Sequence, residues 1–213
     1  TAWPPGGSNC CIRAKSWTNF NPRRGVNDMP ENRQPEDRIW VALHKHLALV
    51  RVEGRGSFKV STSLKEFGQA AQKSGASTAV LDMGNCVGMD STFMGVLAGW
   101  ATRLRQVPGG RLVMINMNSR TRSLVATLGL DLIVQAFETG DLPQDLHAIA
   151  ALSESLSALE PRQESRATTT ETMLEAHENL VKISPENLPR FKDVLLYLRE
   201  DLGRKPGATP ERP

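Results

Sequence analysis

The segment Thr78 to Met83 constrains the fold more than any other part of the chain, because it is apolar at nearly every position. A strand with one face in solvent alternates polar and apolar residues, whereas a strand covered on both faces is apolar throughout. A polar stretch follows from Gly84 to Met89, and the residues Asp90 to Thr92 then offer side-chain oxygens to the free N–H groups of a helix. The pattern predicts a central strand, a polar turn and a helix that packs on the sheet.

Similar elements lie on both sides of this unit. Two runs with alternating apolar residues, Ile39 to Leu43 and Leu47 to Glu53, predict a β-hairpin. The other expected elements are a helix up to Gly75, a strand from Arg111 to Asn116, a helix from Asn118 or Ser119 to about Leu128, and an edge strand from Leu132 to Phe137. The order β-β-α-β-α-β-α predicts an α/β fold in which α-helices cover a mixed β-sheet.

The 213 residues allow one domain with appendages. The first methionine is Met29, so the sequence alone does not say whether the residues before it are native. The expected parts are a disordered leader rich in Pro, Gly, Asn and Arg (1–37), the α/β domain (38–145), a helix and linker (146–167), a helical hairpin (168–203) and a disordered tail (204–213). In the hairpin, Thr168 and Glu171 have capping-box spacing, and Ser184 with Pro185 separates two helices that each have one apolar face.

Composition and charge exclude several classes of protein. The net charge of +3 comes from 26 basic and 23 acidic residues without a long basic block, which gives no case for nucleic acid binding. No stretch has the roughly 20 apolar residues that cross a bilayer, and no secretory signal is visible. Three cysteines form neither a disulfide framework nor a metal pair, and His44 and His46 lack a third ligand. We expect a cytoplasmic protein without metal or cofactor, in which Cys86 is a small packing residue rather than a redox sensor.

The helix after the central strand is apolar over an arc of about 200°, wider than the roughly 100° that a surface helix needs. Phe93, Val96 and Trp100 form a second apolar stripe beside the one that faces the sheet. Two interpretations stay open: the C-terminal hairpin packs on this stripe, or a partner protein binds it. Gly95 and Gly99 have G-x-x-x-G spacing, which indicates close packing with another helix.

Several of these residues resemble a known family. Val80-Leu81-Asp82, followed by Met89-Asp90-Ser91-Thr92 and Gly95-Val96-Leu97, is similar to the signature of the STAS domain, which anti-sigma factor antagonists share with sulphate transporter tails. Gly109 to Val113 and Leu128 to Leu130 resemble the fourth strand of that family and the end of the helix after it. The resemblance implies a STAS fold for the α/β domain.

The resemblance also implies a function and its residues. In antagonists of this family, a partner kinase that is also the anti-sigma factor phosphorylates the serine after the Met-Asp pair, which corresponds to Ser91. The implied switch loop contains Asp82, Asp90 and Thr92, and the implied partner-binding residues are Phe93, Val96 and Trp100. A phosphate adds about −1.5 to −2 charges, which a docked partner would have to desolvate, so binding should be lost.

Two features depart from the antagonist pattern. Phe93 stands where many antagonists have glycine, and the stretch Gly56-Ser57-Phe58-Lys59 lacks their acidic residue. A structural alternative for Ser91 is that it only caps its helix. A hydrolase is not indicated, because the sequence has no G-x-S-x-G elbow and no histidine in a motif relation to Ser91.

The sequence therefore predicts a non-catalytic anti-sigma factor antagonist that binds a serine kinase and so regulates transcription. The alternative is a constitutive STAS interaction or scaffold module, whose hairpin covers the stripe or mediates self-association as a homodimer.

Overall fold

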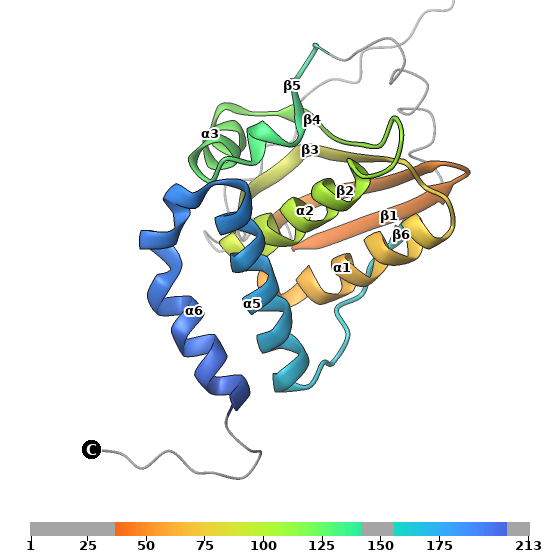
Figure 1. Cartoon of the computed structure of the whole chain (residues 1–213). Coiled ribbons are helices and arrows are strands. Elements are labelled where there is room, and N and C mark those ends of the chain that lie inside the picture. Colours follow the sequence, from red (N-terminus) through yellow and green to blue (C-terminus); the bar gives the residue numbers. More distant parts are fainter. Residues whose placement is uncertain (1–36, 142–155, 204–213) are drawn as a thin grey trace, which may run out of the picture. The chain divides into compact units, whose positions relative to one another are not determined.

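The computed structural model describes residues 37–141 and 156–203. The predicted tail and residues 1–36 of the predicted leader lie outside these ranges, and so does the first part of the predicted helix and linker, up to residue 155. The predictions for these parts stay untested. Within the described part, a six-stranded sheet has the order β5-β4-β3-β2-β1-β6 (Figure 1). Its strands are β1 (Arg38–His44), β2 (Leu47–Gly56), β3 (Thr78–Met89), β4 (Arg111–Met117), β5 (Gln135–Glu138) and β6 (Ser157–Ala158).

The sheet is mixed, as the sequence predicts. β2, β3, β4 and β5 run parallel to one another, whereas β1 is antiparallel to both β2 and β6. The described helices are α1 (Phe58–Lys73), α2 (Ser91–Leu104), α3 (Ser119–Thr127), α5 (Arg166–Ile183) and α6 (Leu188–Gly203), with short 3-10 turns η1 (Leu130–Leu132) and η3 (Pro185–Asn187). α5 packs against α2 and α1, and α6 packs against α5 (Figure 1). The predicted C-terminal helical hairpin is thus confirmed.

The centre of the sheet is buried on both faces. Leu81 of β3 packs toward the helices in the main core, whereas Val80 packs in a second cluster on the opposite face with Leu49 and Val113. This arrangement confirms that the apolar run from Thr78 to Met83 is a central strand covered on both sides.

β2 and β3 are both longer than the sequence suggests. β3 continues to Met89, where a turn was expected from Gly84, and β2 continues to Gly56. The two strands stay paired because β3 has one residue more than β2 at each of two register shifts. One shift lies opposite Arg51 to Glu53 of β2, and the other lies opposite Gly54 and Arg55. Such bulges break the alternation of side chains, so the strand ends look like loops in sequence.

Smaller differences concern helix and strand ends. Ser165, not Thr168, caps α5: its hydroxyl accepts a hydrogen bond from the Thr168 N–H at 3.1 Å, and the helix starts at Arg166. β6 lies in the expected linker and pairs with β1. Asn118 caps α3 through a capping box with Thr121, one of the two caps that the sequence proposed. None of the helices in the described ranges combines the length and apolarity needed to span a bilayer.

Candidate functional site

Asp90 organises the start of α2. It follows β3 directly, and its Oδ1 accepts a hydrogen bond from the Phe93 N–H at 2.8 Å, which caps the helix. Its Oδ2 accepts a second bond from the Phe58 N–H at 2.7 Å, at the first residue of α1. The Asp90 N–H in turn donates to the Gly56 carbonyl at the end of β2, at 2.9 Å. One aspartate therefore holds the ends of β2, α1 and α2 together.

Ser91 is the first residue of α2 and is half-buried. Its Oγ lies 3.0 Å from Nε2 of His177 in α5. Nδ1 of the same ring lies 2.7 Å from the Met173 carbonyl, which can only accept a hydrogen bond. Nδ1 therefore carries the proton, and in the neutral imidazole Nε2 is the acceptor of the Ser91 hydroxyl.

His177 itself is buried and packed. It is 5% exposed, and its ring meets Phe191 of α6 edge-on, with 4.9 Å between the centroids. The sequence alone does not connect His177 to Ser91, because 86 residues separate them. The pair does not form a hydrolase triad, since the partner of Nδ1 is a backbone carbonyl and not a carboxylate.

The glycines of α2 bring α5 into close contact. A Cβ added to Gly95 would overlap the backbone of Ala176, and a Cβ added to Gly99 would meet the side-chain amide of Asn179. The Asn179 amide also lies 3.4 Å from the Gly95 carbonyl oxygen, to which it donates. The close helix packing predicted from the G-x-x-x-G spacing is thus confirmed, and α5 is the helix that uses it.

The apolar stripe of α2 is not an open surface. Phe93, Val96 and Trp100 are 0%, 5% and 1% exposed. The Phe93 ring packs against Gly56, and the Trp100 ring packs against Gly68 of α1, where the missing side chains make room. Of the two interpretations that the sequence leaves open, the structure shows the stripe buried within the chain, beneath β2, α1 and the hairpin. The role of these three residues in partner binding stays a prediction.

Polar contacts complete the interface between α5 and the domain. Glu175 of α5 forms an ion pair with Lys65 of α1 and lies 4.0 Å from the Arg103 guanidinium of α2. Burial lowers the pKa of Arg103, and the Glu175 carboxylate opposes this shift. Thr62 and Thr172 join α1 to α5 through their hydroxyls, 3.3 Å apart.

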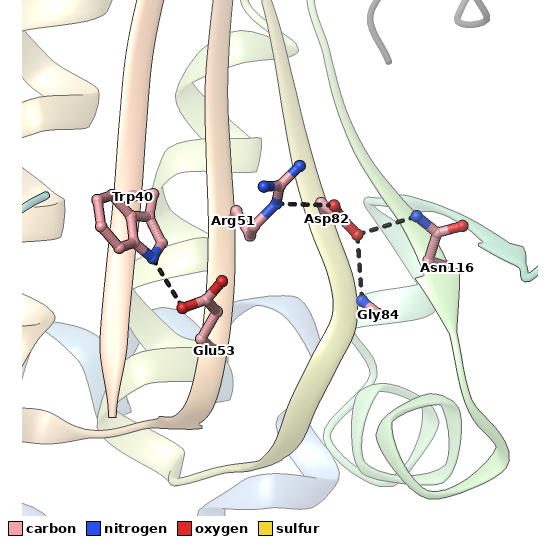
Figure 2. A network of polar contacts seen from close by, with 6 residues as sticks. All are labelled: Trp40, Arg51, Glu53, Asp82, Gly84 and Asn116. Atoms are coloured by element: carbon pink, nitrogen blue, oxygen red, sulfur yellow. Dashed lines mark hydrogen bonds and ion pairs between the residues drawn. The ribbon is translucent and has the colours of Figure 1, made fainter. Parts of the chain in front are cut away.

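Asp82 lies away from Ser91, which corrects its expected place in the same loop. Its side chain is on the sheet face opposite to α2, within β3 and not at its end (Figure 2). Oδ1 accepts hydrogen bonds from the Gly84 N–H at 3.1 Å and the Asn116 amide at 2.9 Å, and Oδ2 accepts one from Arg51 Nε at 3.1 Å. Asp82 therefore ties β2, β3 and β4 together. Of the expected switch loop, Asp90 and Thr92 remain beside Ser91, with Thr92 buried in the first turn of α2.

Cys86 is buried in β3 and is 1% exposed. Burial raises the pKa of its thiol, and backbone hydrogen bonds with Gly88 and Gly56 act in the opposite direction. This environment fits the packing role expected from sequence. Within the described residues, no three His, Cys, Asp or Glu side chains are grouped as a metal ion would require.

Comparisons with known proteins match the α/β domain. Residues 40–135 match the family model described as "Mlab, STAS domain". Among solved structures, a putative anti-sigma factor antagonist from Thermotoga maritima is 15% identical, with 54% of this chain and 91% of that chain covered and a TM-score of 0.42. The anti-sigma factor antagonist SpoIIAA in its unphosphorylated form is also 15% identical, with 56% and 99% covered and a TM-score of 0.43. The Bacillus cell fate determinant SpoIIAA in its phosphorylated form is 16% identical, with 54% and 98% covered and a TM-score of 0.41. A search of curated proteins found no match.

Proposed function

Because residues 40–135 match the STAS family model, we propose that the chain is a protein-binding regulator of the anti-sigma factor antagonist kind. Unphosphorylated, it binds a cytoplasmic serine kinase that is also an anti-sigma factor. Binding releases a sigma factor and so changes transcription. Phosphorylation of Ser91 ends the complex, and the chain itself performs no catalysis.

The position of Ser91 is the observation that supports this proposal. It is the first residue of α2, directly after the Asp90 cap and at the carboxyl end of the central strand β3. Asp90 and its three backbone contacts fix the serine at the junction of β2, α1 and α2. A modification there acts at a rigid point of the domain and not on a loose loop.

The charge of a phosphate explains why binding would stop. The kinase transfers the γ-phosphoryl group of ATP to Oγ of Ser91, the O–H bond breaks, and the proton and ADP leave with the kinase. The ester adds about −1.5 to −2 charges next to the Asp90 carboxylate. Backbone hydrogen bonds to both oxygens hold the Asp90 carboxylate in place, so it cannot turn away from the phosphate. The two anions repel each other, and water must solvate them. A docked partner would remove that solvent.

The test compares two serines in equivalent positions. Ser119 is the first residue of α3 and follows the Asn118 cap, as Ser91 follows Asp90 in α2. Wild type, Ser91→Asp and Ser119→Asp are used to capture proteins from the native cell extract, and mass spectrometry identifies them. We expect wild type and Ser119→Asp to retain one kinase-like anti-sigma factor and Ser91→Asp to lose it. Retention of the same protein by Ser91→Asp would contradict the proposal.

One observation favours a second function, the constitutive scaffold. The hairpin already occupies the Gly95 face of α2, and α6 leaves Leu196 and Tyr197 each 58% exposed. A scaffold could use this outer face of α6 for self-association without any phosphorylation. Equal capture by Ser91→Asp and wild type, together with a dimer that Tyr197→Glu dissociates in analytical ultracentrifugation, would support it.

A further inference from the structure

We propose that the α5–α6 hairpin is a displaceable cover over the Ser91 end of α2, so that a partner must compete with the chain's own hairpin. The contact of the hairpin with α2 is a property of this chain alone and needs no partner. The competition rests on the function proposed above.

The hairpin touches α2 where the proposed modification would occur. The His177 ring accepts the hydrogen bond of the Ser91 hydroxyl, and one turn further along α2 the Ala176 backbone sits directly on Gly95. Closed, the hairpin therefore blocks both the reactive hydroxyl and the adjacent helix surface.

The interface has the composition of one that can open. The buried residues of α5 are Thr170, Thr172, Ala176, His177 and Leu180. Thr172 and His177 meet the domain through polar atoms, whereas the Thr170 hydroxyl donates to Asp201 of α6, within the hairpin. Glu175 adds ion-pair contacts to Lys65 and Arg103 at the edge. Contacts between parts of one chain that move apart are more polar than permanent cores, because both surfaces can be solvated after separation. The hydroxyl groups of Thr62 and Thr172, which contact each other across the interface, can likewise bind water after separation.

The far end of the hairpin is anchored elsewhere. At its turn, the Asn187 amide donates to the Leu128 carbonyl at 3.0 Å, and the Arg190 guanidinium donates to the Thr127 carbonyl at 2.8 Å. These contacts hold the turn to the end of α3, outside the contact between α5 and α2. The hairpin thus stays close to α2 when α5 lifts, which gives it a high effective concentration for closing again.

Closure and phosphorylation exclude each other. The Ser91 hydroxyl hydrogen donates to Nε2 of His177, 3.0 Å from Oγ. Forming the phosphate ester removes that hydrogen and places a phosphoryl group where the imidazole ring stands. The kinase must therefore act on the open form, and a phosphorylated chain cannot close as before.

A cysteine at position 91 makes the cover measurable without any partner. The full chain with Ser91→Cys is treated with N-ethylmaleimide, and peptide mass spectrometry gives the labelling rate at position 91. Gly95→Ala adds a Cβ that overlaps the Ala176 backbone, which cannot move away locally, so α5 must lift. Gly99→Ala is the matched control, because its Cβ meets mainly the end of the Asn179 side chain, which can swing aside. Both changes favour the α2 helix equally.

We expect position 91 to label about 10 to 1000 times faster with Gly95→Ala than with Gly99→Ala. A minor open form is populated at roughly 0.1–10%, and Gly95→Ala should make it the major form. Hydrogen exchange should rise in α5 but stay low in the sheet. If Gly95→Ala unfolds the domain, Ala176→Leu opens the interface from the hairpin side and leaves the domain sequence unchanged. Equal labelling in the folded Gly95→Ala, Ala176→Leu and Gly99→Ala variants would overturn the cover and leave the function of Ser91 standing. Faster labelling, combined with capture that Ser91→Asp does not change, would establish the cover and overturn the kinase switch.

Discussion

Oγ of Ser91 and Nε2 of His177 lie 3.0 Å apart, although 86 residues separate them in sequence. Because Nδ1 of the same ring is held by the Met173 carbonyl, the imidazole has little freedom to turn away. The bond therefore joins the α/β domain to the C-terminal hairpin at a fixed point. It also makes the serine a structural residue of the closed form as well as the proposed site of modification.

The two residues should be energetically coupled. Ser91→Ala leaves the buried Nε2 without a donor and should lower the free energy of unfolding by about 1 kcal/mol. His177→Ala also removes the Phe191 contact and should lower it by about 2–4 kcal/mol. In the double variant the losses should fall short of additivity by about 0.5–1.5 kcal/mol, measured by urea unfolding. Ser123→Ala, an exposed hydroxyl on α3, is the control and should change stability by less than about 0.5 kcal/mol. Strict additivity would mean that the bond does not stabilise the closed form.

Asp90 should show a graded loss. Asp90→Asn keeps an Oδ1 acceptor for the α2 cap but puts an NH2 group where Phe58 needs an acceptor, so we expect a loss of about 1 kcal/mol. Asp90→Ala removes both acceptors and should cost about 2 kcal/mol. Ser165→Ala, an exposed cap with one backbone partner, provides the reference for a single lost cap. If Asp90→Asn is as stable as wild type, the contact to Phe58 contributes nothing.

Features carried by neighbouring residues could be predicted from the sequence. The apolar run of β3, the cap by Asn118 and the close packing at Gly95 and Gly99 each depend on a short pattern, and the structure has all three. The C-terminal helical hairpin, with one apolar face on each helix, follows from such patterns as well. These signals are local because helix caps, helix faces and strand alternation are local properties.

Features that depend on pairing could not be predicted in this way. Whether Gly84 starts a turn or continues β3 is decided by β2, whose register shifts keep the strand paired as far as Met89. The face on which Asp82 points follows from that pairing too. The contact of Ser91 with His177 needs the packing of α5 on α2, which no spacing within either helix encodes. A buried histidine on an apolar helix face was the one available hint.

Asp82 should matter for stability and not for the proposed switch. It accepts three hydrogen bonds across β2, β3 and β4, but its side chain is 26% exposed, so the Arg51 ion pair contributes little. Asp82→Ala should lower the free energy of unfolding by about 1–2 kcal/mol through the lost Gly84 and Asn116 partners. Labelling at position 91 and capture of the partner should be unchanged at a temperature where the variant is folded. Loss of capture by a folded Asp82→Ala would return Asp82 to the switch.

Cys86 should make stability fall at alkaline pH. Burial raises the pKa of its thiol in the folded state above the usual value of about 8.5 in an unfolded chain. The folded chain then keeps a proton that the unfolded chain has lost, so the contribution is fully present below about pH 8.5 and is lost as the pH rises toward the folded pKa. The loss from this one group can reach about 1.4 kcal/mol per pH unit.

Urea unfolding of wild type and Cys86→Ala at pH 7, 9 and 10 isolates this contribution of Cys86, because every other titrating group is common to both proteins. The stability difference between the two proteins should be constant up to about pH 8 and then move in favour of Cys86→Ala. A difference that stays constant to pH 10 would show that the thiolate is tolerated in β3.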